Sequence, residues 1–347
     1  MKLLREQLFY LSILTTCFLP LLAPSAGADV KPQKENYEPD YTTYHNVSSL
    51  ETEIQRLTKR YSDFIQLNNN YKSSAGQSQL VFRVSNFSSI AGSLKGKVRI
   101  FLSFGEHARE FFPVESMLHF IKNITDGVSQ DTNKTEGLKF SSWVLNNFDI
   151  IIIGMANPDG RVYIEKTQNY CWRGTESGVD INRNFNWNFG GQGSSSNPLD
   201  GEYRGPHAFS EPETEVFQNI SSIFVPDAFV SFHSGVRHIY IPFADSESKQ
   251  GRRFPANKVL LVRLARHISR SSPSRLFKFG HAYDLTGYTA DGTSFDFMAG
   301  HAKIPFSLAI ELWEHRHHRG RSCFDEFNPE NEDLQVGLAI FEWIFEK

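Results

Sequence analysis

Short apolar runs alternate with amphipathic segments along most of this chain, and this alternation limits its possible folds more than any other feature. The run at 148–157, FDIIIIGMAN, contains four consecutive isoleucines, which is typical of a strand covered on both faces. Similar runs predict strands at 97–104, 227–234 and 305–312. Helical periodicity predicts helices at 48–67 (with Ser48 or Ser49 as N-cap), 113–124, 257–272 and 332–347. This order indicates an α/β layer structure with a largely parallel sheet.

The first 28 residues have the pattern of a secretory signal peptide. Lys2 and Arg5 precede a short apolar stretch, and the small residues at 26–28 form an A-x-A cleavage site. The alternative is a membrane anchor, but a spanning helix needs ~20 apolar residues, and Pro20 interrupts this stretch. We therefore expect a signal peptide at 1–28, a flexible polar leader at 29–43 and one globular domain at 44–347, with no membrane span after cleavage.

Sequons and cysteines agree with secretion. The candidate glycosylation sites are Asn46, Asn86, Asn123, Asn133 and Asn219. Cys171 and Cys323 remain after signal removal and are candidates for a disulfide, the alternative being two buried thiols. The net charge is −3 and the signs are mixed, so no basic block predicts nucleic-acid binding. We expect a monomer that is extracellular or in the lumen of the secretory pathway, vacuole and lysosome included.

Polar side chains follow all four predicted strands. His107 and Glu110 follow the strand at 97–104, and Asn157 and Asp159 follow the isoleucine run. His233 and Glu311 stand at the ends of the strands at 227–234 and 305–312. Carboxyl ends of parallel strands meet at one edge of a sheet, where ligands collect. Catalytic zinc takes three protein ligands, and two histidines with one glutamate form a known set. His107, Glu110 and His233 are therefore candidate zinc ligands, although a solvated helix start and an ordinary buried histidine are the alternative.

Several motifs occur together in an order that resembles the zinc metallocarboxypeptidases of the carboxypeptidase A/B (funnelin) type. They are GEHARE, NPDGR, GVDINRN, RGPHAFSEPET, SFHS, GYTADGTSFDF and AIEL, and the resemblance covers residues 44–347. It implies a three-layer α/β/α sandwich with a mixed, mainly parallel central sheet. It also implies one zinc ion per chain, held by His107, Glu110 and His233, and a substrate that is the C-terminus of a peptide or protein.

The resemblance assigns roles in peptide hydrolysis to two further residues. Glu311 matches the family's general base, and its apolar surroundings in FSLAIELW predict a raised pKa. Arg173, in NYCWRG, resembles the residue that stabilises the oxyanion of the tetrahedral intermediate. The alternatives are a strand-end glutamate facing solvent and an ordinary surface arginine.

Recognition of a free chain end is implied by the motif DINRNFN. Asn182 and Arg183 match the pair that binds the substrate carboxylate, for which an arginine fork is well suited. Asp180 matches a carboxylate that orients a zinc-bound imidazole. Tyr288 matches a mobile tyrosine that closes over the terminal residue, and Arg109 resembles a residue of a more distant subsite.

The side chain of the terminal residue is expected to enter an apolar pocket. Phe295 stands where relatives that select Lys or Arg have an acidic residue, and Ala244 matches another lining position. Aromatic or aliphatic terminal residues are therefore expected. A one-residue slip in this alignment would bring Asp291 or Asp296 into the pocket instead.

Two other functions remain open from the sequence. One is a zinc amidase or deacylase acting on small acylated amino acids, which loss of Arg183 would have favoured. The other is a non-catalytic member of the fold, which loss of a ligand or of Glu311 would have favoured. All of these residues are present.

Overall fold

The computed structural model describes residues 39–87, 94, 96–129, 135–271, 277–315 and 322–329. All of them lie in one compact unit, residues 32–347. The signal peptide expected at 1–28, most of the leader expected at 29–43, the sequon at Asn133 and the helix expected at 332–347 fall outside the described residues. Among the described helices, none is long and apolar enough to cross a lipid bilayer.

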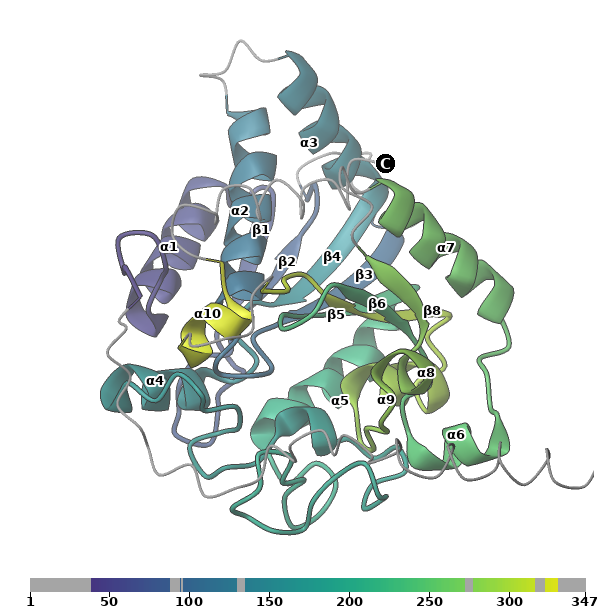
Figure 1. Ribbon diagram of the computed structural model, residues 1–347. Coiled ribbons are helices and arrows are strands. Elements are labelled where there is room, and N and C mark those ends of the chain that lie inside the picture. The colour runs from purple at the N-terminus through teal and green to yellow at the C-terminus, as the bar shows by residue number, and fades with distance from the viewer. Residues whose placement is uncertain are drawn as a thin grey trace, which may run out of the picture. The chain divides into compact units, whose positions relative to one another are not determined.

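A mixed sheet of eight strands forms the centre of the described chain (Figure 1). The strands are β1 (Ile65–Asn68), β2 (Val81–Val84), β3 (Val98–Phe104), β4 (Phe148–Ile153), β5 (Ala228–His233), β6 (His238–Ile241), β7 (Lys278–His281) and β8 (Phe306–Glu311). Their order in the sheet is β1-β2-β4-β3-β5-β8-β6-β7. The neighbouring strands β4, β3, β5 and β8 are mutually parallel, and antiparallel pairs flank them. These four are the strands predicted from the sequence.

Helices cover both faces of the sheet, as Figure 1 shows. One apolar core lies between the sheet and α1 (Val47–Arg60), α2 (Phe111–Val128), α3 (Thr135–Asn147), α4 (Pro158–Thr167), α7 (Lys258–Ser271) and α10 (Cys323–Phe327). A second core lies between the opposite face and α5 (Pro212–Phe224), α8 (Ala282–Thr286) and α9 (Ser294–Gly300). The remaining helices are α6 (Ser246–Gly251) and the short 3-10 helix η1 (Ile181–Arg183). The three-layer sandwich expected from the sequence is confirmed.

Alternation along the central strands builds both cores. On β4, Ile150 and Ile152 face the core under α2, whereas Ile153 faces the core under α5. Successive side chains of a strand point to opposite faces, so a run of isoleucines suits a strand with a core on each side. On β8, Leu308 and Ala309 divide between the two cores in the same way.

The helix expected at 48–67 is shorter than predicted. It ends at Arg60, and Ile65–Asn68 form β1, which pairs with β2 instead. Its N-cap is Asn46, whose side-chain oxygen accepts a hydrogen bond from the backbone N–H of Ser49 at 2.8 Å. The ladder of β1 with β2 gives these residues long-range partners that local periodicity cannot reveal.

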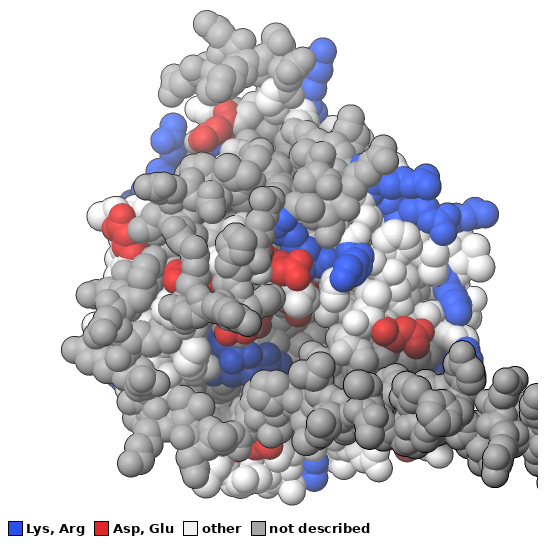
Figure 2. Space-filling model, in the orientation of Figure 1, with Lys and Arg blue, Asp and Glu red and all other residues white. Residues whose placement is uncertain are grey.

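Charges of both signs lie on the face shown in Figure 2. Lys and Arg gather over α7, whose sequence KVLLVRLARHISRS is rich in arginine. Near the centre of the view, acidic and basic side chains lie close together. This face therefore does not carry one sign of charge over its whole area.

Candidate active site

Three of the parallel strands end at the candidate site. β3 leads into the loop that carries His107 and Glu110, β5 ends at His233, and β8 ends at Glu311. In the register of β5 and β8, His233 lies opposite Glu311, and β3 pairs with β5 on its other side. The site therefore lies at the carboxyl ends of parallel strands, where the sequence predicted it.

His107, Glu110 and His233 converge into a buried group that could hold a metal ion. Nδ1 of His107 lies 2.6 Å from Oε1 of Glu110 and 3.1 Å from Nδ1 of His233. Nδ1 of His233 lies 3.1 Å from Oε2 of Glu110. Ligand atoms bound tetrahedrally at ~2.1 Å from zinc would lie ~3.4 Å apart. The donor types therefore fit zinc, and the three ligand atoms lie about 0.3 to 0.8 Å closer together than they would around a bound ion.

The outer nitrogens of both imidazoles face carboxylates. The Ser231 hydroxyl donates to Oε1 of Glu106 at 2.6 Å, so it accepts from Nε2 of His233 at 2.7 Å. This places the proton of neutral His233 on Nε2 and leaves the lone pair of Nδ1 for a metal. Nε2 of His107 lies 3.4 Å from Oδ1 of Asp180. Asp180 therefore lies beside the outer nitrogen of His107.

Glu106 is a site residue that the sequence motifs did not reveal. Its buried carboxylate accepts hydrogen bonds from Ser103 at 2.8 Å, Ser231 at 2.6 Å and Ser294 at 3.1 Å, and it lies 3.7 Å from Nε2 of His233. In the sequence, Glu106 stands next to a proposed ligand and can be taken for a solvent-exposed loop residue. The available signal was the pairing of β3 with β5, which sets Ser103 opposite Ser231 on neighbouring strands.

The motif NPDGR supports the backbone of the metal-binding loop. The backbone N–H of Asn157 donates to Gly105 O at 3.0 Å. Arg161 donates to Ala108 O at 2.8 Å and to Glu110 O at 3.0 Å, and its guanidinium stacks on the ring of Phe111 at 3.5 Å. Burial lowers the pKa of Arg161 to about 10, so the guanidinium remains charged at neutral pH. These contacts hold the loop through its backbone carbonyl groups.

The electrostatics of the group favour a cation. Burial opposes charge on Glu110, yet its contacts with His107 and His233 hold the pKa of Glu110 well below its usual range. Burial likewise disfavours protonated His233, but the hydrogen bond and charge of Glu110 raise the pKa of His233 to about 9. The same negative surroundings that favour a proton here would favour a divalent ion.

Glu311 and Arg173 line one cavity of about 90 Å³ together with His107 and His233. Burial, and then the negative charge of Glu110, raise the pKa of Glu311 to about 7. Its Oε2 is buried and has no hydrogen-bond partner among the described residues. Arg173 donates from Nε to Oδ2 of Asp180 at 2.8 Å. The cavity thus combines a carboxylate able to take up a proton with a fixed guanidinium.

The predicted carboxylate-binding pair lines the same cavity. Nδ2 of Asn182 lies 3.4 Å from Nε2 of His233, and its Oδ1 accepts from the backbone of Ser294 at 2.9 Å. Arg183 is held by Gly193 O at 3.0 Å from its Nε. Tyr288 also lines the cavity but is 58% exposed, so it stands at the mouth.

The family comparison agrees with this arrangement. The family described as zinc carboxypeptidase matches residues 50–336. The chain belongs to the zinc carboxypeptidase family. Carboxypeptidase A1 of Rattus norvegicus is 30% identical over 285 residues, which are 79% of this chain and 63% of that protein. Carboxypeptidase A2 of Mus musculus is 30% identical over 251 residues, 70% of this chain and 57% of that protein. The chain thus spans less than two thirds of the length of these relatives.

Solved structures show the same fold. Bovine thrombin-activatable fibrinolysis inhibitor in complex with tick carboxypeptidase inhibitor superposes with a TM-score of 0.72 at 22% identity, covering 88% of this chain and 97% of that one. Carboxypeptidase A from Helicoverpa armigera gives 0.67 at 23% identity, covering 98% of this chain and 80% of that one. At these identities the likeness establishes the zinc carboxypeptidase fold.

The remaining predicted site residues fall into two groups. Phe295 and Ala244 line the cavity. Asp291 and Asp296 do not; their carboxylates accept hydrogen bonds from Gly193 N and from Ala244 N at 2.8 Å, respectively. Arg109 is not a lining residue of this cavity either, and its guanidinium stacks on the ring of Phe327 at 4.0 Å.

The cysteines and most of the sequons lie in the described part of the chain. Cys171 and Cys323 are joined by a disulfide, with their Cα atoms 5.1 Å apart.

Among the described sequons, the side chain of Asn219 is exposed, whereas those of Asn46, Asn86 and Asn123 are half-buried. Asn219 is therefore the most accessible to a glycan.

Proposed function

We propose that the protein is a zinc-dependent metallocarboxypeptidase that hydrolyses the C-terminal peptide bond of peptides or proteins, with one zinc ion per chain. The observation that carries this proposal is a single cavity lined by His107 and His233, by the carboxylate of Glu311 with its unpartnered oxygen, and by the guanidinium groups of Arg173 and Arg183. His107, Glu110 and His233 would hold the ion, and Asp180 would orient His107. A bound zinc ion supplies Lewis-acid activation of water and of the scissile carbonyl.

The chain's own residues would divide the remaining chemistry. Glu311 takes the proton of the attacking water and passes it to the leaving amine, a task suited to a pKa of about 7. Arg173 stabilises the negative charge that develops on the carbonyl oxygen, because its guanidinium is already fixed by Asp180. Neither residue needs to reorganise before the reaction.

Selection of the chain end would rest on Asn182 and Arg183. Their amide and guanidinium groups bind the free carboxylate, and an amidated terminus lacks the negative charge that this site recognises. Tyr288, exposed at the mouth, closes over the terminal residue and excludes water. Arg109 contacts substrate residues farther from the terminus.

The pocket supports an apolar terminal side chain, aromatic or aliphatic. Phe295, Ala244 and Tyr240 line it, and no lining residue is acidic apart from Glu311.

The sequence supports the cellular setting proposed with this function. Residues 1–28 are a cleaved signal peptide, 29–43 a leader and 44–347 the catalytic domain. The mature protein is a glycosylated monomer without a membrane span, outside the cell or in the secretory-pathway lumen, and it does not bind nucleic acid.

The test compares matched peptides with free and amidated C-termini. The wild-type protein should release one residue from the free end only. Glu311→Gln should lower kcat/KM by ~100-fold or more while zinc content stays equal to wild type. Glu314→Gln, at an exposed position three residues on, is the control and should keep activity. Equal cleavage of amidated peptides, or no release by the zinc-loaded protein, would contradict the proposal.

A further inference from the structure

Glu110 occupies the N-cap position of α2, but its side chain does not cap the helix. The carboxylate faces His107 and His233 instead, at 2.6 Å and 3.1 Å. Ser, Thr, Asp or Asn at this position ordinarily accepts a hydrogen bond from the first N–H groups of its own helix. The two tasks are incompatible, because the carboxylate cannot face both the helix end and the imidazoles.

Asn328 caps α2 from the far end of the chain. Its Oδ1 accepts hydrogen bonds from the backbone N–H groups of Phe111 at 2.7 Å and Phe112 at 2.9 Å. The next helical residue is Pro113, which has no N–H, and the N–H of Glu110 donates to His107 O at 3.2 Å. All the N–H groups that a helix start leaves unpaired are thus satisfied without the Glu110 side chain.

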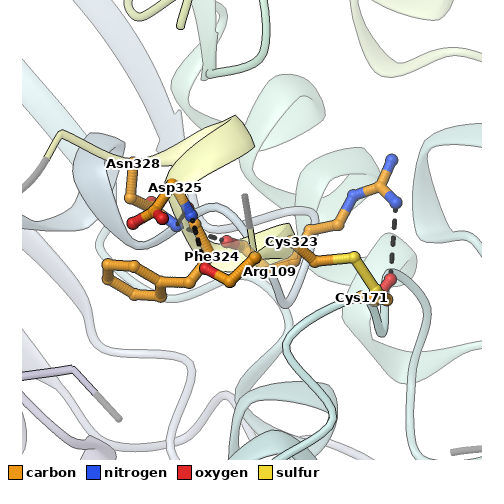
Figure 3. The surroundings of a disulfide bond; sticks show 7 residues. Arg109, Cys171, Cys323, Phe324, Asp325 and Asn328 are labelled. Carbon is orange, nitrogen blue, oxygen red and sulfur yellow. Dashed lines mark hydrogen bonds between the residues drawn. A yellow bond between two sulfur atoms is a disulfide. The ribbon is translucent and has the colours of Figure 1, made fainter. Parts of the chain in front are cut away.

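Asn328 is itself fully buried and held on its other side. Its Nδ2 donates to Arg109 O at 3.0 Å and to Phe324 O at 2.9 Å, which ties the metal-binding loop to α10 (Figure 3). The disulfide of Cys323 with Cys171 fixes the start of α10, and Arg109 donates to Cys171 O at 3.4 Å (Figure 3). Asn328 is therefore held in place by the two hydrogen bonds that its side-chain amide donates, and the disulfide holds the helix that carries it.

We propose that Asn328, anchored by the Cys171–Cys323 disulfide, is a positioning residue of the metal centre. By capping α2 it leaves the Glu110 carboxylate free to serve as a metal ligand. This inference rests on the proposed function only in that the ligands bind zinc. Without Asn328, the Glu110 carboxylate is the acceptor that the helix start itself carries. Turning toward the exposed N–H groups would withdraw it from the ion and from the backbone N–H of Ser234, from which its Oε2 accepts at 3.2 Å.

The experiment measures zinc affinity of the full chain by competition with a chromophoric chelator. Asn328→Ala should weaken zinc binding by about 10- to 100-fold. Asn328→Asp keeps both acceptor bonds to α2 but loses the two donor bonds to Arg109 O and Phe324 O, so it should recover part of the affinity lost in Asn328→Ala. Glu326→Gln, exposed on the same helix, is the control and should bind zinc like wild type. Cobalt-substituted Asn328→Ala should also show an altered visible absorption band, since the geometry of one ligand changes.

Wild-type zinc affinity in Asn328→Ala, with an unchanged cobalt spectrum, would overturn the inference while leaving the proposed function intact. Failure of the wild type itself to bind zinc would refute the proposed function instead. If Asn328→Ala does not fold, Cys323→Ser replaces it, and its zinc should dissociate several-fold faster than from wild type. An unchanged dissociation rate in that variant would equally overturn the inference.

Discussion

Glu213 makes the stability of this protein depend on pH in a way that one substitution should remove. It lies in the first turn of α5, is fully buried and accepts hydrogen bonds from the backbone and hydroxyl of Ser74 at 3.2 Å and 3.3 Å. Burial raises the pKa of Glu213 to about 7, and the nearby charges of Asp159 and Glu211 act in the same direction. Among the described residues, none of the three proposed metal ligands is a hydrogen-bond partner of Glu213, so a bound ion should not alter this balance.

The sign follows from proton binding in the two states. Below its ordinary pKa of 4.5, Glu213 is protonated in both the folded and the unfolded chain. Between 4.5 and about 7 the unfolded chain loses this proton while the folded chain keeps it, so the free energy of unfolding falls as pH rises. At about 1.4 kcal/mol per pH unit, the loss amounts to about 3 kcal/mol, and it is complete above pH 7 to 8.

The assay is urea unfolding of wild type and Glu213→Gln at intervals from pH 4.5 to 8, with zinc at one saturating concentration. Glutamine keeps an acceptor and a donor for Ser74 but cannot ionise, so the variant should gain about 3 kcal/mol on wild type across this range. Glu215→Gln, exposed in the same turn, is the control, and its free energy of unfolding should change with pH as that of wild type does. A stability difference that stays constant with pH would refute the reasoning.

Three further substitutions test the site. Arg183→Lys loses the two-point fork, so kcat/KM for a free C-terminus should fall about 100-fold and preference over the amidated peptide should shrink; unchanged preference would exclude Arg183 from carboxylate binding. Glu106→Gln removes the carboxylate beyond His233 and should weaken zinc binding about 10-fold in chelator competition, whereas equal affinity would make Glu106 purely structural. Tyr240→Ala enlarges the terminal pocket, so the ratio of kcat/KM for terminal phenylalanine over alanine should rise at least 10-fold; an unchanged ratio would show that Tyr240 does not limit the pocket.

The sequence predicted the metal group well because its members lie where strands end. His233 and Glu311 each close an apolar run, and such runs could be assigned to buried parallel strands without knowing the fold. His107 and Glu110 follow a third run, and parallel strands bring their carboxyl ends together by topology alone. Strand positions placed these residues at one edge of the sheet, and the resemblance to the zinc carboxypeptidases then selected His107, Glu110 and His233 as the ligands.

Local sequence could not predict the residues that lie behind the proposed metal ligands, such as Glu106. Glu106 is recognised only once β3 and β5 are paired, because that pairing sets Ser103 beside Ser231. The register of two strands separated by more than a hundred residues is decided by packing and not by either strand alone. The edge strand β1 was assigned to a helix because its pairing with β2 likewise depends on packing and not on the local sequence.

Glu110 shows why such a site draws on remote parts of the chain. Its backbone must start α2, and its side chain must leave that helix start unsatisfied to face two imidazoles. The Glu110 side chain alone cannot meet both demands, since its carboxylate already faces the two imidazoles. The missing acceptor comes from Asn328, 217 residues from Phe111, and a helix tied down by a disulfide presents it. Conflicts between local preference and function are expected at active sites, and here distant contacts resolve one.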